Sequence, residues 1–226
     1  MVAETVQNEY YDITTVVTGP TETNCYIVYH HPSTETLIID PGEDASKIID
    51  IANAKRGIAG ELRYILLTHA HHDQLGAAAA LSDEFKIPCA FHKGDKRLFR
   101  MAAAHALEES GRKVRVPLSY RAFIKEPDFY FGGHQVSVIH TPGHTAGSVC
   151  YVIDNSIFTG DTLLHGQLGS TDATKANIEK MSQSIDKIFE KCPENKIIYP
   201  AHGAPWQLDP ARNWWQENNI LVAEIL

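Results

Sequence analysis

The 226-residue sequence contains no run close to the roughly 20 consecutive apolar residues that a transmembrane helix requires. Its start, MVAETVQNEYYD, also lacks the basic region and the apolar core of a secretory signal peptide. These absences predict a cytoplasmic protein without a membrane partner.

Cysteine is scarce. The four cysteines, Cys25, Cys89, Cys150 and Cys192, are far apart in the sequence and form no CxxC pair. We therefore predict four reduced thiols, as is usual for a cytoplasmic protein, rather than disulfides.

The chain also lacks an excess of positive charge, because its formal net charge is -8. This balance argues against binding to nucleic acid, whose phosphates attract basic proteins. Residues 86–125 are an exception, with ten Lys and Arg residues against three acidic ones. Such a segment is usually the solvated face of a helix. The alternative is a basic helical flap, at about residues 94–125, that attracts an anionic small-molecule substrate.

The sequence has no internal repeat, low-complexity segment or Gly/Ser-rich linker, and its length suits one domain spanning residues 1–226. Asp154 and Asn155 are predicted to form a tight turn between two strands. Apolar runs rich in β-branched and aromatic residues predict strands at residues 13–19, 24–30, 36–40, 63–68, 136–141, 148–153, 156–160 and 196–200.

Helices are predicted in the gaps, at residues 43–56, 73–86, 95–109 and 174–191, the last with Thr174 as its N-cap. Their apolar stripes are predicted to belong to the core rather than to a cofactor site. In the third helix this stripe consists of Leu98, Met101, Ala102 and His105. Strands that alternate with helices indicate the α/β class.

Three tryptophans near the end of the sequence, Trp206, Trp214 and Trp215, are predicted to pack against the body of the domain. The alternative is a contact between two copies of the chain, because exposed aromatic clusters often mark interfaces. The sequence leaves the oligomeric state open, with a dimer as one alternative.

Five of the predicted strands are followed by short turns that carry His or Asp. These turns contain Asp40, the segment His69-Ala70-His71-His72-Asp73, His144, Asp161 and His202. Sites in open α/β sheets form beyond the carboxyl ends of the strands, so the five turns are expected to converge. Neutral imidazole and carboxylate groups suit zinc, iron or manganese. The pattern therefore predicts a metal site rather than an ordinary polar surface.

The segment THAHHDQLG at 68–76 resembles the THxHxDHxxG signature of the metallo-β-lactamase superfamily. The segments IIDPG at 38–42, TPGHTAGS at 141–148, FTGDTL at 158–163 and YPAHG at 199–203 resemble its other motifs in order and approximate spacing. Within the superfamily, the chain is most similar to small glyoxalase II-like hydrolases. The resemblance implies a four-layer αβ/βα sandwich, with metal bound at one edge between its two sheets.

The resemblance also implies two neighbouring metal positions. Asp40 would orient the metal ligands from behind, as such partners generally do. The implied ligands are His69, His71 and His144 for the first metal and Asp73, Asp161 and His202 for the second, with Asp161 bridging the two.

The chain departs from the family pattern at Gln74, where the signature has histidine. An amide oxygen is a weaker zinc ligand than imidazole, so we expect one firmly bound Zn²⁺ and a weakened second position. Fe²⁺ is the alternative metal. His72 occupies a variable position of the signature and is expected to line the pocket or to be exposed, with a role as substitute ligand as the alternative.

The resemblance implies a metal-dependent hydrolase, in which a metal-bound hydroxide attacks an ester or thioester. Asp73 would orient the water and transfer a proton. The alternatives are a mononuclear iron persulfide dioxygenase and a degenerate metal-binding module without catalytic activity.

Two departures from glyoxalase II argue against glutathione as part of the substrate. The sequence ends at Leu226, without the C-terminal helical domain of that family, and Ser170 in the segment GSTD at 169–172 replaces the family's arginine. The basic segment could supply a replacement cation for an anionic substrate, with Lys93, Arg97 and Arg100 as candidates.

Overall fold

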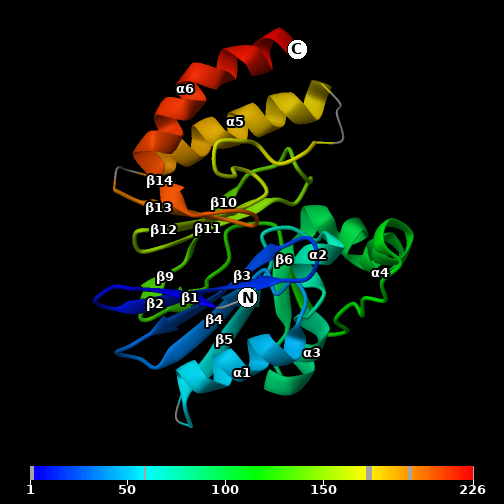
Figure 1. Ribbon diagram of the computed structural model, residues 1–226, viewed down its shortest axis with the longest axis vertical. Helices are drawn as coiled ribbons and strands as arrows, with labels where there is room; N and C mark the ends of the chain where they lie inside the picture. The colour runs from blue at the N-terminus through cyan, green and yellow to red at the C-terminus, as the bar shows by residue number, and fades with distance from the viewer. Residues whose placement is uncertain (1–2, 59, 172–174, 193–194, 226) are drawn as a thin grey trace.

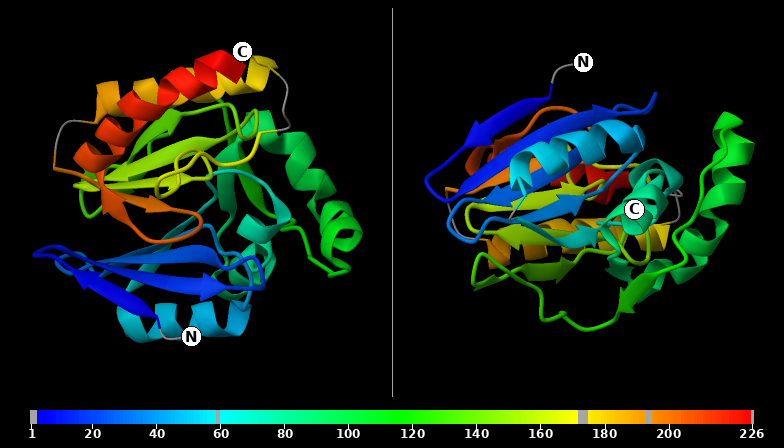
Figure 2. Two further views of the ribbon diagram at one scale, coloured as in Figure 1. Left: turned by 45° about the horizontal axis from the view of Figure 1, so that its top comes forward. Right: turned by 90° about the horizontal axis from the view of Figure 1, so that it is seen from below.

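The computed structural model describes residues 3–58, 60–171, 175–192 and 195–225. Two β-sheets pack face to face, and helices cover the outer face of each sheet (Figures 1 and 2). This arrangement is the four-layer αβ/βα sandwich that the sequence predicts. The predicted N-cap Thr174 and Asp172 of the GSTD segment lie outside the described residues.

The first sheet follows the order of the chain. Its strands are β1 (Glu4–Gln7), β2 (Tyr11–Thr18), β3 (Thr23–His30), β4 (Glu35–Ile39), β5 (Glu61–Leu66), β6 (Cys89–His92) and β7 (Tyr120–Phe123). Strands β1 to β4 are antiparallel, whereas β4 to β7 are parallel. Because parallel strands end at the same edge of a sheet, the segments that follow β4, β5 and β6 lie beside one another.

The second sheet contains β10 (Ser137–His140), β11 (Val149–Ile153), β12 (Ser156–Gly160), β13 (Ile197–Pro200) and β14 (Trp206–Gln207), in this order. Strands β10 and β12 are both antiparallel to β11, and β13 is parallel to β12. Strands β10, β12 and β13 therefore point the same way and end at one edge. Asp154 and Asn155 form the predicted turn between β11 and β12. A separate ribbon pairs β8 (Tyr130–Phe131) with β9 (His134–Gln135).

The helices complete the outer layers. Figure 1 shows α1 (Ala45–Arg56) and α3 (Ala78–Phe85) on the first sheet, and α5 (Lys175–Lys191) and α6 (Leu208–Ile225) on the second. Helix α4 (Lys96–Ser110), preceded by the short 3₁₀ turn η1 (Lys93–Asp95), lies at the side of the sandwich (Figure 1). Within the described residues, no helix is long and apolar enough to cross a membrane.

Three buried apolar clusters lie between the four layers. The central one joins the two sheets: the rings of Phe158 and Tyr199 stack at 5.3 Å, and Tyr26 packs edge-on against both. The four cysteines are free and buried, as predicted. The tryptophans lie at the contact between the second sheet and its helices, where Trp215 Nε1 donates a hydrogen bond to Asp186 Oδ1 at 2.7 Å.

The continuous helix predicted over residues 73–86 is wrong, because the structure has a short helix α2 (His72–Leu75) that is separate from α3. The break lies at Gly76 and Ala77. The backbone N–H of Ala77 donates to the carbonyl oxygens of Pro41 and Gly42, at 3.0 and 2.7 Å. Gly76 lies so close to the Gly42 carbonyl that a Cβ atom there would collide with it. Contacts with the turn after β4 therefore interrupt a sequence of strong helix formers.

The apolar stripe predicted for the third helix is also wrong in part. The residues of α4 that are buried are Phe99, Ala102 and Ala106. Met101 is 43% exposed and His105 is half-buried, so these two residues lie outside the core. The helix presents a second, partly apolar face that the core does not cover.

The layered core predicts a matched pair of stability effects. Leu37, in β4 between the sheets, is 0% exposed, whereas Leu118 is 97% exposed. We expect Leu37→Ala to lower the free energy of unfolding by about 2–5 kcal/mol, because it removes buried methyl groups and leaves a cavity. Leu118→Ala should change it by less than about 0.5 kcal/mol. Urea denaturation measures both, and equal effects would contradict the assigned position of the core.

Candidate metal centre

Six strands of the two sheets direct their carboxyl ends to one edge of the sandwich. In the first sheet, Asp40 follows β4, the histidine loop follows β5, and Asp95 follows β6. In the second sheet, His144, Asp161 and His202 follow β10, β12 and β13. The strand directions therefore bring together residues that are far apart in the sequence.

Three histidines form a compact cluster at this edge. One ring nitrogen from each of His69, His71 and His144 lies within 4.8 Å of the other two. His144 Nε2 is 3.2 Å from His69 Nε2 and 2.9 Å from His71 Nδ1. The rings are close to perpendicular, with centroids 4.6 to 4.9 Å apart, so their edges rather than their faces meet.

The hydrogen bonds behind the cluster fix which nitrogen carries the proton. Thr68 Oγ1 donates its hydrogen to Asp40 Oδ2 at 2.7 Å, so it can only accept a hydrogen from His69 Nδ1 at 3.2 Å. In the same way, His144 Nδ1 donates to the backbone oxygen of Ser170 at 2.5 Å. The Nε2 atoms of His69 and His144 therefore carry free lone pairs and point at each other.

The imidazoles of His69 and His71 are neutral bases. Burial first, and then the neighbouring rings of His144 and His71, lower the pKa of His69 well below its usual range. Burial and the nearby His144 lower the pKa of His71 to about 4. Both rings are therefore uncharged at pH 7, which is the form that binds metal ions.

A carboxylate completes the cluster on its second-sheet side. Asp161 Oδ2 lies 3.3 Å from His144 Nε2 and 3.7 Å from His69 Nε2. Its other oxygen, Oδ1, is buried and has no hydrogen-bond partner among the described residues. The Nε2 lone pairs of His69 and His144 and the carboxylate oxygen of Asp161 would repel one another, and a cation between them removes that repulsion. The residues present therefore fit a metal ion.

Asp40 supports the same interpretation. Its Oδ1 accepts a hydrogen bond from the backbone N–H of Thr68 at 2.7 Å, and the residue has a positive φ of 50°. Burial raises the pKa of Asp40 to about 8, although its two hydrogen bonds with Thr68 act in the opposite direction. A buried carboxylate of this kind is stabilised by a nearby positive charge.

A second cluster of possible ligands lies beside the first. His202 Nε2 is 3.5 Å from Asp73 Oδ2 and 3.7 Å from Asp161 Oδ1. Burial alone would lower the pKa of His202, but the hydrogen bond with Asp73 and the charge of Asp161 raise it to about 9. His202 is therefore an imidazolium paired with carboxylates at pH 7, and a metal would have to displace its proton. This position is less ready for a metal than the histidine cluster.

Gln74 reinforces that difference. The side chain is completely buried, and its Nε2 donates a hydrogen bond to Asp73 Oδ2 at 3.1 Å. The amide therefore uses its N–H to bind the Asp73 carboxylate oxygen and does not present its own oxygen to a metal at this position. Gln74 Oε1 is itself buried without a hydrogen-bond partner among the described residues.

His72 points away from the centre. Its Nε2 pairs with Glu109 Oε2 at 3.0 Å, near the end of α4, and it does not belong to the histidine cluster. The pairing gives the alternative of a substitute ligand no support. The His72 side chain is 12% exposed and is not among the residues that line the cavity beside His71 and His144, so its expected place in the pocket or at the surface stays a prediction.

Sequence reasoning missed Asp95, which joins the two histidine loops. The buried carboxylate accepts hydrogen bonds from the N–H groups of Ala70 and Gly147 at 3.0 and 2.6 Å, and from Thr145 Oγ1 at 2.8 Å. Burial raises its pKa, against these hydrogen bonds. The signal was present in the sequence, because Asp95 is another carboxylate just after an apolar strand. That strand, β6, has only four residues and was not predicted.

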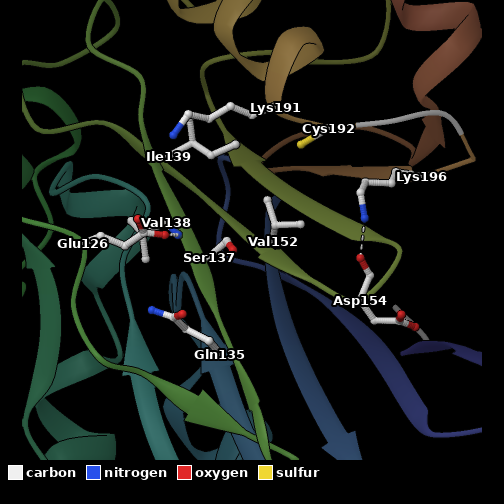
Figure 3. A pocket seen from close by; sticks show the side chains of 10 residues that line it. All are labelled: Glu126, Gln135, Ser137, Val138, Ile139, Val152, Asp154, Lys191, Cys192 and Lys196. Atoms are coloured by element: carbon white, nitrogen blue, oxygen red, sulfur yellow. Dashed lines mark hydrogen bonds between the residues drawn. The ribbon is translucent and has the colours of Figure 1, made fainter.

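Two cavities can be compared. One, of about 410 Å³, lies beside His71 and His144 and is walled by α4. Another, of about 400 Å³, lies at β10 and β11 and is lined by Lys191, Lys196 and Glu126 (Figure 3). None of the clustered histidines lines this second cavity, so the first is the one that gives access to the candidate metal centre.

Known proteins share this architecture. Over 191 residues, the chain is 31% identical to the probable metallo-hydrolase YqgX of Bacillus subtilis, with 82% of this chain and 87% of YqgX covered. The crystal structure of the BLEG-1 B3 metallo-beta-lactamase is similar with a TM-score of 0.79 and 28% identity, and 93% of this chain and 99% of that chain are covered. The crystal structure of TTHA1623 in a di-iron-bound form gives a TM-score of 0.73 and 28% identity, over 86% and 94% of the two chains.

The similarity extends over most of the chain. The sequence model of the Metallo-beta-lactamase superfamily matches residues 18–215 of this chain, a range that includes every strand end of the candidate centre. The fold, the order of the motifs and the relatives agree. The chain belongs to the metallo-β-lactamase superfamily.

Proposed function

We propose that this protein is a metal-dependent hydrolase that cleaves esters or thioesters, similar to the glyoxalase II-like hydrolases. The observation that carries the proposal is the cluster of His69, His71, His144 and Asp161, in which the Nε2 lone pairs of His69 and His144 face each other beside the Asp161 carboxylate. The similarity to a probable metallo-hydrolase supports it. A cavity of about 410 Å³ beside the cluster leaves room for a substrate.

Zn²⁺ is the metal that we propose, because neutral imidazoles and a carboxylate are its usual ligands at catalytic sites. When bound, it would lower the pKa of a water molecule and polarise the carbonyl group of the substrate. Fe²⁺ is the alternative, since a structure of similar fold contains two iron ions. Thr68, Asp40 and Ser170 hold the rings of His69 and His144 in the orientation that presents Nε2.

Asp73 is the residue that we propose for proton transfer. Burial alone would raise its pKa, but the hydrogen bond with His202 and the nearby imidazoles lower it, so Asp73 is a carboxylate at neutral pH. Gln74 Nε2 and Thr23 Oγ1 hold its Oδ2 in place, at 3.1 and 3.4 Å. A fixed carboxylate beside the histidine cluster is suited to orient the attacking water and to accept its proton.

A thioester suits this arrangement for a simple chemical reason. The leaving group is a thiolate, and because the pKa of a thiol is about 8.5, it leaves without protonation by a strong acid. An alcohol leaving group depends more on protonation, so we expect thioesters to be cleaved faster than the corresponding alkyl esters.

Metal binding by the histidine cluster can be tested with two adjacent residues of one loop. His71 presents Nδ1 to the cluster, whereas the neighbouring His72 pairs with Glu109. We expect His71→Ala to weaken Zn²⁺ binding by more than about a hundredfold, because loss of a ligand exceeds the 10–100-fold effect of losing an outer partner. His72→Ala should stay within about threefold of the wild type. Competition with a chromophoric chelator measures both, and equal losses would contradict the assignment.

The second position can be tested at Gln74. Gln74→His would replace an amide tied to Asp73 with an imidazole next to Asp73 and His202. We expect the wild type to hold one Zn²⁺ per chain after dialysis and the variant to hold two, because imidazole is the better zinc ligand. Elemental analysis gives the stoichiometry. Two equally firm metals in the wild type would overturn the prediction of a weakened second position.

The hydrolase proposal itself is tested by turnover. Purified protein with Zn²⁺ should hydrolyse members of a panel of acyl thioesters and esters, and a chelator should abolish that activity. Asp73→Asn should lower kcat by about 10²–10⁴-fold, the usual contribution of a positioned acid or base, while the zinc content of the histidine cluster is retained. Absence of chelator-sensitive turnover on the whole panel would contradict the proposal, and an unchanged kcat in Asp73→Asn would contradict the role of Asp73.

A further inference from the structure

The cavity beside the candidate metal centre has a composite wall. His71 and His144 form one side, and Arg97, Leu98, Met101 and His105 of α4 form the other. Its volume, about 410 Å³, lies within the range of roughly 300–1,000 Å³ that is typical of small-molecule pockets. The cavity is therefore large enough for part of a substrate whose reacting group lies at the histidines.

Both ends of α4 are attached to the histidine loops. Asp95, directly before the helix, holds the loop that follows β10 through Thr145 and Gly147. Glu109, in the last turn, pairs with His72 of the loop that follows β5. The helix thus lies across the centre from one loop to the other. Between Arg97 and His105 it rises by about 12 Å, at 1.5 Å per residue.

The face of α4 toward the cavity differs from its buried face. Leu98 is half-buried and Met101 is 43% exposed, and both line the cavity. With a spacing of four residues, Arg97, Met101 and His105 lie on one side of the helix. The result is a cavity wall with an apolar centre and a cation toward one end, although Leu98 also packs partly against the core.

Arg97 is the Lys or Arg residue of the basic segment that lines the cavity. Arg112 pairs with Glu43 and Arg115 with Asp83, whereas the guanidinium of Arg97 has no ion pair or hydrogen bond with another side chain in the described part of the chain. Of the three candidates from the sequence, Arg97 lines the cavity and Lys93 and Arg100 do not. Asp95 is nearby, but both of its oxygens already accept hydrogen bonds.

From this geometry we infer that the inner face of α4 recognises a substrate with an aliphatic segment that ends in a carboxylate. The aliphatic segment contacts Leu98 and Met101, and the carboxylate binds the guanidinium of Arg97, whose planar donors match its two oxygens. The inference rests on the proposed function for the reaction, because the other end of such a molecule would be the thioester or ester at the histidine cluster. It narrows the substrate class to ω-carboxyacyl thioesters or esters.

Binding of a molecule that cannot be hydrolysed tests the inference separately from catalysis. The probes are 6-(ethylthio)hexanoate and its primary amide, which has the same shape and no charge. With the zinc-loaded protein, calorimetry should show that the carboxylate binds about tenfold more tightly than the amide. Arg97→Gln should reduce that preference to within about twofold, and Arg97→Lys should retain part of it.

Two further variants serve as controls. Arg100→Gln removes the same charge from the same helix at an exposed position outside the cavity, and the preference should persist. Met101→Ala should weaken both probes alike, by about threefold to tenfold, because it removes apolar contact and no charge. Equal binding of carboxylate and amide by the wild type would overturn the inference. A preference for the carboxylate that survives Arg97→Gln would also overturn it, because the carboxylate would then bind the metal. An equal loss of the preference in Arg97→Gln and Arg100→Gln would overturn it as well.

Turnover then separates this inference from the proposed function. The substrates are the adipoyl monothioester of N-acetylcysteamine and its terminal amide. If the Arg97-dependent binding preference is found but neither thioester is hydrolysed, the recognition by α4 stands and the hydrolase proposal fails for this class. If both are hydrolysed with the same KM in the wild type and in Arg97→Gln, the hydrolase stands and the role of Arg97 is wrong.

Discussion

The close approach of the Nε2 lone pairs of His69 and His144 is the constraint that the rest of the structure must satisfy. His144 Nε2 lies 3.2 Å from His69 Nε2 and 2.9 Å from His71 Nδ1, and burial lowers the pKa of His69 and of His71, so that both rings are uncharged at neutral pH. Such an arrangement is unfavourable on its own, and the surrounding structure must enforce it. The two sheets do so by directing six strand ends to the same edge.

Buried carboxylates complete that enforcement. Asp40 fixes the loop after β5 through Thr68, and Asp95 joins the same loop to the one after β10. Neither side chain belongs to the histidine cluster, yet each accepts backbone N–H bonds that set where the loops lie. The hydrogen bonds of Asp40 and Asp95 stabilise the loops and also keep the histidine rings close together against their repulsion. Protein stability and metal affinity are therefore linked at these two residues.

Local pattern revealed eight strands with apolar runs and so the α/β class, whereas the four layers were implied by the resemblance of the motifs to a known family. The elements that it did not reveal include α6 and six strands of two to four residues, which are β1, β6, β7, β8, β9 and β14. Without β6 the role of Asp95 was hidden. The split between α2 and α3 was equally invisible, since it depends on carbonyl groups of Pro41 and Gly42 that are distant in the chain. The residues of the histidine cluster were named from the sequence, whereas their ligand roles stay predictions.

The four buried cysteine thiols can report local opening of the fold. Burial raises the pKa of Cys25, Cys89, Cys150 and Cys192, so an alkylating reagent reaches a reactive thiolate only after the surrounding layer opens. Cys25 and Cys89 lie between the first sheet and its helices, and Cys150 and Cys192 between the second sheet and its own. The two halves of the sandwich can therefore be followed separately by the alkylation rates of their thiols. The ratio of these rates reveals whether the two halves open together or independently.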